Sequence, residues 1–176
     1  NLNATIAESL ERFAPVAEAA RADGIPVRGY VSMATDSPFE GHVPPENAAR
    51  VVVALRDMGC YEVAVSDTIG QATPERIDAM LAVVLDEMPA GQLAGHYHDT
   101  AGRALQNIDA SLARGLRVFD AAVGGLGGCP YAPGAKGNVA TELVAAHLAA
   151  QGYETGLDPA VIERAAQMAQ AMRVGP

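Results

Sequence analysis

Two spacings of apolar residues alternate along the chain. Stretches with apolar residues at helical spacing end at a glycine, and short runs rich in valine follow them. The helical spacing is clearest at Ile77, Met80, Leu81, Val84, Leu85 and Met88, which recur at i, i+3, i+4 and i+7. Strands that alternate with amphipathic helices predict βαβ units and therefore a parallel sheet.

Short motifs mark where the helices begin. Residues 5–8 have the pattern of a capping box, and Leu10, Phe13 and Ala17 form the predicted buried stripe behind it. Helices are predicted at about 5–24, 44–59, 73–88, 105–115, 138–150 and from 158 onward. Strands are predicted at 26–31, 61–66, 93–98 and 118–123; counted from starts near 27, 61, 93 and 117, they are about 34, 32 and 24 residues apart. Such separations suit βαβ units.

Composition narrows the class of protein. The chain has 176 residues, 49% of them hydrophobic and 19% charged, which suits one domain with a buried core. Acidic residues outnumber basic ones by 21 to 12, and the net charge of -9 argues against nucleic acid as a partner. No apolar run approaches the ~20 residues of a membrane span. Two cysteines disfavour a disulfide scaffold and favour a reducing compartment.

Polar residues gather after the predicted strands, at the edge where parallel α/β folds bind ligands. His96 and His98 are two positions apart on one strand, so their side chains share a face about 7 Å apart and can converge on one cation. Two buried histidines satisfied by neighbours are the alternative. We favour a metal site because Asp99 is adjacent at the carboxyl end of the strand.

A glycine-rich loop follows the last predicted strand. Six of the fifteen residues from 124 to 138 are glycine, which predicts a mobile loop that carries Cys129 as an accessible thiol. A connection with an incidental cysteine is the alternative. Asn138 is either a helix N-cap or an oxygen ligand for a hard cation, and Glu142 lies one turn further on.

The remaining titratable residues are weaker candidates. Asp67 ends a buried strand, either as a cap or as a functional carboxylate. Cys60 is expected to be a buried small hydrophobe, and His42 and His147 to be ordinary surface or packing residues.

Four stretches together resemble the hydroxymethylglutaryl-CoA lyase family, which belongs to a superfamily of metal-dependent, aldolase-like TIM barrels. They are VRGYVS (27–32), MGCYEVAVSDTIG (58–70), HYHDTAGRALQN (96–107) and GGLGGCPYAPGAKGNVATE (124–142). The cysteine loop is the most specific of them, because related Claisen-condensing synthases carry a different loop.

The resemblance implies a role for each matching residue. His96, His98 and Asn138 match metal ligands, and His96 is also a catalytic candidate. Further catalytic candidates are Cys129, Asp67 and Glu142. On the substrate side, the resemblance implies Tyr30 and Thr68.

The implied reaction is a carbon–carbon lyase reaction of leucine degradation, the cleavage of 3-hydroxy-3-methylglutaryl-CoA to acetyl-CoA and acetoacetate. Mixed nitrogen and oxygen ligands favour Mg²⁺ or Mn²⁺ as the cofactor, with zinc as the alternative. The expected partner is a small-molecule acyl-CoA, and neither nucleic acid nor a membrane is expected as a partner. The expected location of the protein is the cytoplasm or a mitochondrial matrix.

The resemblance also predicts the fold, the carboxyl-terminal half of a (β/α)8 TIM barrel. Residues 1–176 are expected to form one partial domain, strands five to eight with the helices that follow, because the family's first-strand Arg-Asp pair is missing before Asn1. Open sheet edges then favour a homo-oligomer or pairing with the missing half-barrel. A Claisen-condensing synthase and a non-catalytic half-barrel are the alternative functions.

Overall fold

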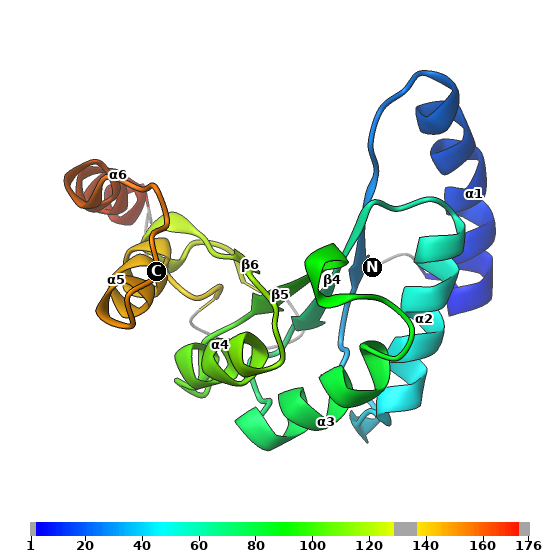
Figure 1. Ribbon diagram of the computed structural model, residues 1–176, viewed down its shortest axis with the longest axis horizontal. Coiled ribbons are helices and arrows are strands. Elements are labelled where there is room, and N and C mark those ends of the chain that lie inside the picture. The colour runs from blue at the N-terminus through cyan, green and yellow to red at the C-terminus, as the bar shows by residue number, and fades with distance from the viewer. Residues whose placement is uncertain (1–2, 129–136, 173–176) are drawn as a thin grey trace.

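The computed structural model describes residues 3–128 and 137–172 and contains a parallel sheet (Figure 1). Its strands are β1 (Arg28–Val31), β4 (Glu62–Asp67), β5 (Leu93–Tyr97) and β6 (Val118–Asp120). They lie in the order β1-β4-β5-β6, and every neighbouring pair is parallel. The predicted α/β class, with four parallel strands and flanking helices, is therefore confirmed.

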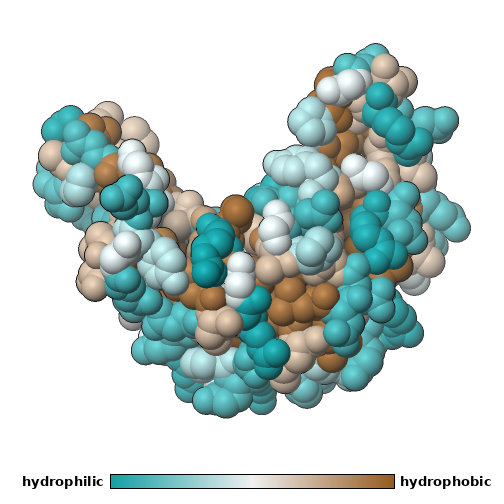
Figure 2. Space-filling model, viewed as in Figure 1, coloured by the Kyte–Doolittle hydropathy of each residue, from teal (hydrophilic) through white to brown (hydrophobic). Residues whose placement is uncertain are grey.

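Helices cover one face of this sheet and extend beyond both of its ends. They are α1 (Ile6–Ala22), α2 (Pro45–Asp57), α3 (Pro74–Val84), α4 (Ala104–Ala113), α5 (Thr141–Ala150) and α6 (Pro159–Ala171). In Figure 1, α2, α3 and α4 form the layer on that face, while α1 stands at one end and α5 and α6 at the other. Figure 2 shows the resulting crescent, whose hollow side is the other face of the sheet.

The motifs that mark helix starts act as predicted. The Glu8 amide donates to Thr5 Oγ1 over 3.2 Å, and the Thr5 amide donates to the Glu8 carboxylate over 2.7 Å. Thr73 and Asp158 also accept hydrogen bonds from first-turn amides, each just before a proline. Such caps typically contribute about 1 kcal/mol each.

The main core lies between the sheet and its helices. Side chains alternate along each strand, so Val63, Val65 and Leu93 face the helices, where they are fully buried. Tyr97 shares this face, and its hydroxyl lies 2.7 Å from Ser111 Oγ of α4. Gly95 is required beside it, because a Cβ there would lie 2.8 Å from the Tyr97 ring.

Some predicted boundaries were wrong. β6 ends at Asp120 rather than at 123, because the chain turns into a short 3-10 helix, η2 (Val123–Gly125), in which Gly124 has a φ of 67°. α3 ends at Val84 rather than at 88. Asn138 precedes α5 instead of starting it. Phe13 is 44% exposed, because α1 stands beyond the edge of the sheet rather than over its core.

Besides η2, three small elements were not predicted. They are the hairpin of β2 (Asp36–Ser37) and β3 (Gly41–His42) and the 3-10 turn η1 (Ala90–Gln92). Within residues 3–128 and 137–172, no helix is both long and apolar enough to cross a membrane.

Candidate active site

The hollow face of the sheet carries a chain of polar and charged side chains that contact one another. In the strand registers, Arg28 is level with Glu62, and His96 with Asp120. Ser66, which shares the face of Glu62 on β4, is level with His96, so all four side chains point to the same face. Arg28 Nε donates to Glu62 over 2.5 Å, and Arg28 Nη1 lies 2.9 Å from the Asp120 carboxylate. The second ion pair joins the two edge strands, β1 and β6, across the face.

His96 is part of this chain of contacts. Its Nδ1 lies 3.0 Å from Asp120 Oδ2. Burial by itself would raise the pKa of Asp120, but the hydrogen bonds from His96 and Arg28 outweigh burial and lower that pKa to about 2. The Tyr30 ring meets the His96 ring edge-on, with centroids 5.9 Å apart. Asp120 is therefore an anion whose acceptor oxygens hold both neighbours.

His98 is the more deeply placed of the two histidines. Its ring lies beside that of His96, with centroids 5.6 Å apart, and only 7% of the residue is exposed. Burial, with His96 nearby, lowers the pKa of His98 and so favours the neutral imidazole that binds metals. Its Nδ1 is buried without a hydrogen-bond partner among the described residues, which is unusual for a ring nitrogen.

Backbone pairing places Asn138 beside His98. Asn138 and His98 form an isolated antiparallel bridge, and the Val139 amide donates to the Tyr97 carbonyl over 3.1 Å. The Asn138 amide nitrogen donates to the Leu126 carbonyl over 3.0 Å. The side chain is thus tied through its nitrogen to the glycine-rich segment, and its oxygen is the atom suited to a cation.

The segment that carries Cys129 begins and ends next to Asn138. Cys129 itself lies outside the described residues, and its role stays a prediction. The described flanks of the segment are close together, because a Cβ on Gly137 would fall 1.8 Å from the Gly127 carbonyl oxygen. Only glycine fits at 137, where φ is 90°.

Glu142 supports the start of the same segment. Its Oε2 accepts a hydrogen bond from the Gly124 amide over 3.1 Å. A side chain at Gly124 would crowd Ala169 of α6, with 3.1 Å between the two Cβ atoms. Glu142 therefore contacts backbone that leads toward Cys129, and its predicted catalytic role stays a prediction.

Asp67 lies on the other face of the sheet from His96. Its side chain is buried beside Tyr97 in the register and accepts hydrogen bonds from the Gln71 and Ala72 amides, over 3.1 and 3.0 Å. Burial raises the pKa of Asp67 to about 6, although these hydrogen bonds act to lower it. Its backbone carbonyl accepts from the His98 amide over 3.2 Å. These contacts position the loop after β4 and the backbone of His98.

The two predicted substrate-side residues lie at the β1 side of the hollow face. Tyr30 is half exposed, and its hydroxyl accepts from the Arg28 guanidinium. Thr68 Oγ1 accepts from the Met33 amide over 2.8 Å, where Met33 holds a positive φ of 55°. Thr68 therefore fixes the turn after β1, while Tyr30 presents a ring to the open face.

Sequence reasoning missed Arg28, Glu62 and Asp120. Each follows the strand alternation, but only the register between strands shows that they meet. Among the residues that the structure describes, no group of three His, Cys, Asp or Glu side chains is arranged to hold a metal ion. The candidate metal site therefore depends on two imidazoles and an amide.

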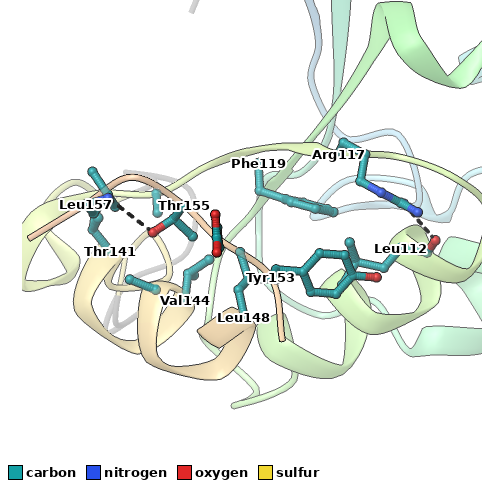
Figure 3. Close-up of a pocket in the computed structure, with 12 residues that line it drawn as sticks. Leu112, Arg117, Phe119, Thr141, Val144, Leu148, Tyr153, Thr155 and Leu157 are labelled. Atoms are coloured by element: carbon teal, nitrogen blue, oxygen red, sulfur yellow. Dashed lines mark hydrogen bonds between the residues drawn. The ribbon is translucent and has the colours of Figure 1, made fainter. Parts of the chain in front are cut away.

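The hollow face is distinct from the cavity in Figure 3. That cavity, of about 390 Å³, lies on the helix-facing side of β6 and is lined by residues such as Leu112, Phe119, Val144 and Tyr153. The Arg117 guanidinium lies 5.7 Å from the centre of the Tyr153 ring at one end of it. Among the described residues, no histidine lines the cavity, so the hollow face remains the candidate active site.

His147 and Cys60 lie apart from the site, as predicted. His147 Nε2 is 2.7 Å from Asp109 Oδ1, between α5 and α4. Cys60 is a free, buried cysteine. His42 is exposed in the small hairpin, with Nδ1 3.2 Å from the Thr35 carbonyl oxygen.

Comparison with known proteins gives a consistent result. Residues 1–169 match the HMGL-like family. The chain is 49% identical over 158 residues to a hydroxymethylglutaryl-CoA lyase from Pseudomonas mevalonii, covering 90% of this chain and 52% of that protein. A mitochondrial hydroxymethylglutaryl-CoA lyase from Bos taurus is 48% identical over 173 residues, covering 98% of this chain and 53% of the relative.

A solved structure agrees with these sequence matches. The HMG-CoA lyase from Brucella melitensis superimposes with a TM-score of 0.97 at 55% identity, covering 99% of this chain and 62% of that one. The parallel sheet and its helices therefore match part of the TIM barrel of such a lyase. The chain spans about half the length of the curated relatives it matches.

Proposed function

The chain belongs to the HMGL-like family, and on this premise we propose that the intact protein cleaves 3-hydroxy-3-methylglutaryl-CoA to acetyl-CoA and acetoacetate. One observation carries the proposal. His96, His98 and Asn138, the residues matched to metal ligands, meet at the carboxyl end of β5, beside the glycine-rich segment that bears Cys129. Because parallel α/β folds bind ligands at this edge, the arrangement suits a metal-dependent lyase.

The residues present fit a divalent cation. Within the described residues, the buried Nδ1 of His98 has no hydrogen-bond partner, and the lowered pKa of that ring favours the neutral form that a metal ligand needs. His96, His98 and the Asn138 oxygen would hold Mg²⁺ or Mn²⁺. When bound, such a cation supplies Lewis-acid polarisation of the tertiary alcohol of the substrate.

The chain's own residues then handle substrate and protons. Loss of the alcohol proton lets the carbon–carbon bond break, which leaves acetoacetate and the enolate of acetyl-CoA. We assign Cys129 to protonate that enolate carbon, and Tyr30 and Thr68 to the substrate side, while His96 belongs to the residues that would hold the cation and the alcohol proton leaves to water. Glu142 holds the backbone leading to Cys129, and Asp67 holds the loop after β4.

The domain prediction remains a proposal as well. Within the described residues, β1 and β6 are the outer strands of the sheet. We propose that residues 1–176 correspond to strands five to eight of a barrel whose other strands pair with these edges, since open backbone groups there favour a partner strand.

The experiment is a product assay on the intact protein. With 3-hydroxy-3-methylglutaryl-CoA and Mn²⁺, we expect acetoacetate and acetyl-CoA to form in equal amounts, and chelation to stop both. Cleavage that proceeds equally after chelation, or no cleavage with Mn²⁺ or Mg²⁺ present, would overturn the proposal.

A further inference from the structure

We propose that Asp120, held in place by Arg28, is a positioning residue that orients His96 so that its Nε2 is the nitrogen presented to the cation. The inference rests on the proposed metal-dependent function and deepens it. Neither Asp120 nor Arg28 belongs to the ligand set inferred from sequence.

The first step is the direction of the hydrogen bond. An ionised carboxylate has only acceptor atoms, so the 3.0 Å contact between His96 Nδ1 and Asp120 Oδ2 requires a proton on Nδ1. In a neutral imidazole the other nitrogen, Nε2, then carries the free lone pair. Metal-binding histidines commonly donate their second nitrogen to a carboxylate in this way.

The second step concerns the contacts that hold the Asp120 carboxylate in place. Arg28 Nη1 lies 2.9 Å from the Asp120 carboxylate, and Arg28 Nε is bound to Glu62 on the neighbouring strand. The guanidinium also lies 4.9 Å from the centre of the Tyr30 ring. A rigid, planar guanidinium with contacts on β1, β4 and β6 restricts the carboxylate to one place. The ring of His96 is therefore restricted by groups on three other strands.

The chain supplies a matched control. His147 and Asp109 form a second histidine–carboxylate pair, 2.7 Å long, between α5 and α4. This pair lies outside the hollow face. Asp120→Asn and Asp109→Asn therefore make the same chemical change in the same type of pair. Only Asp120→Asn should weaken binding of the cation.

The test uses the intact protein and Mn²⁺ alone as the probe. We expect Asp120→Asn to weaken Mn²⁺ binding about 10- to 100-fold, measured from the electron paramagnetic resonance signal of free Mn²⁺. Asp109→Asn should stay within about twofold of wild type. Equal affinity of Asp120→Asn and wild type, or no Mn²⁺ binding by wild type, would overturn the inference.

A second readout does not depend on a variant that folds. In the metal-free wild-type protein, at a pH where the ring is neutral, ¹⁵N chemical shifts should show His96 protonated at Nδ1 and not at Nε2. The reverse tautomer would overturn the inference.

Arg28→Lys, which keeps one charge but lacks the planar fork, should weaken Mn²⁺ binding several-fold.

These readouts also separate the inference from the proposed function. If the tautomer and the Mn²⁺ affinities follow expectation while the substrate is not cleaved, the positioning role stands and the lyase assignment fails. If cleavage occurs but Asp120→Asn binds Mn²⁺ like wild type, the lyase assignment stands and the positioning role fails.

Discussion

Arg28 and Asp120, which are 92 residues apart in sequence and lie on the two edge strands, pair across the hollow face of the sheet at 2.9 Å. Both side chains are mostly buried, at 18% and 23% exposed. The pair therefore links the first and last strands of the sheet through side chains rather than through backbone.

Removing this link should destabilise the intact protein. Arg28→Met leaves Glu62 and Asp120 without their cation, and we expect a loss of about 1–3 kcal/mol in the free energy of unfolding. Urea denaturation measures it. The control is Arg114→Met, which breaks the exposed Arg114–Asp78 pair between α4 and α3 and should cost less. An equal loss in both variants would show that the link across the face has no special role.

The pKa of Asp67 predicts a pH-dependent term in stability. Its folded-state pKa of about 6 lies above the ordinary value, so the folded protein binds this proton more tightly than the unfolded chain. The tighter proton binding adds to the free energy of unfolding below about pH 4, and this added stability is lost as the pH rises to about 6. Asp67→Asn cannot titrate, so the stability of wild type relative to Asp67→Asn should fall by roughly 1–3 kcal/mol over that range. A relative stability that rises over the same range would contradict the burial argument.

The bond between Glu142 and the Gly124 amide predicts a kinetic effect. Glu142→Ala removes the acceptor that holds the start of the glycine-rich segment, so we expect kcat to fall about tenfold or more, with a smaller change in KM. Steady-state assays of the intact enzyme measure both. Glu163→Ala, on the exposed side of α6, is the matched control and should leave both constants unchanged. A change confined to KM would instead indicate a role in substrate binding.

The two cysteines should differ in reactivity. Burial raises the pKa of the Cys60 thiol and shields it, whereas the sequence predicts an accessible Cys129. Iodoacetamide should therefore modify Cys129 first, and loss of activity should follow that modification. Mass spectrometry of peptides from wild type and from Cys60→Ala identifies the site. Cys129→Ser should reduce turnover far more than it weakens acyl-CoA binding. Near-native turnover in that variant would show that the thiol takes no part in the reaction.

Local patterns in the sequence predicted most of the fold. The capping box at Thr5 and the proline starts at Pro74 and Pro159 act locally, so they could be identified without a structure. The end of β6 and the place of Asn138 depend on backbone pairing between distant segments. That pairing, seen at His98 and Asn138, has no local signal.

The candidate site was only partly predictable for the same reason. His96 and His98 share a face because of strand alternation alone, which is a local rule. Asp120 reaches His96 only because their strands are in register, and single-sequence patterns do not give register. Asp67 was expected to act at the site, but its place in the strand turns its side chain to the opposite face.

The central claim is that His98 belongs to a metal site that cleaves the acyl-CoA. The most direct test is the Mn²⁺-dependent rate of acetoacetate formation by intact wild type, His98→Ala and the control His42→Ala. We predict that this rate falls about 100-fold or more in His98→Ala and does not fall in His42→Ala. The reason is that His98 adds a buried imidazole to the site, whereas His42 is exposed in the small hairpin. A His98→Ala rate equal to that of wild type would contradict the account.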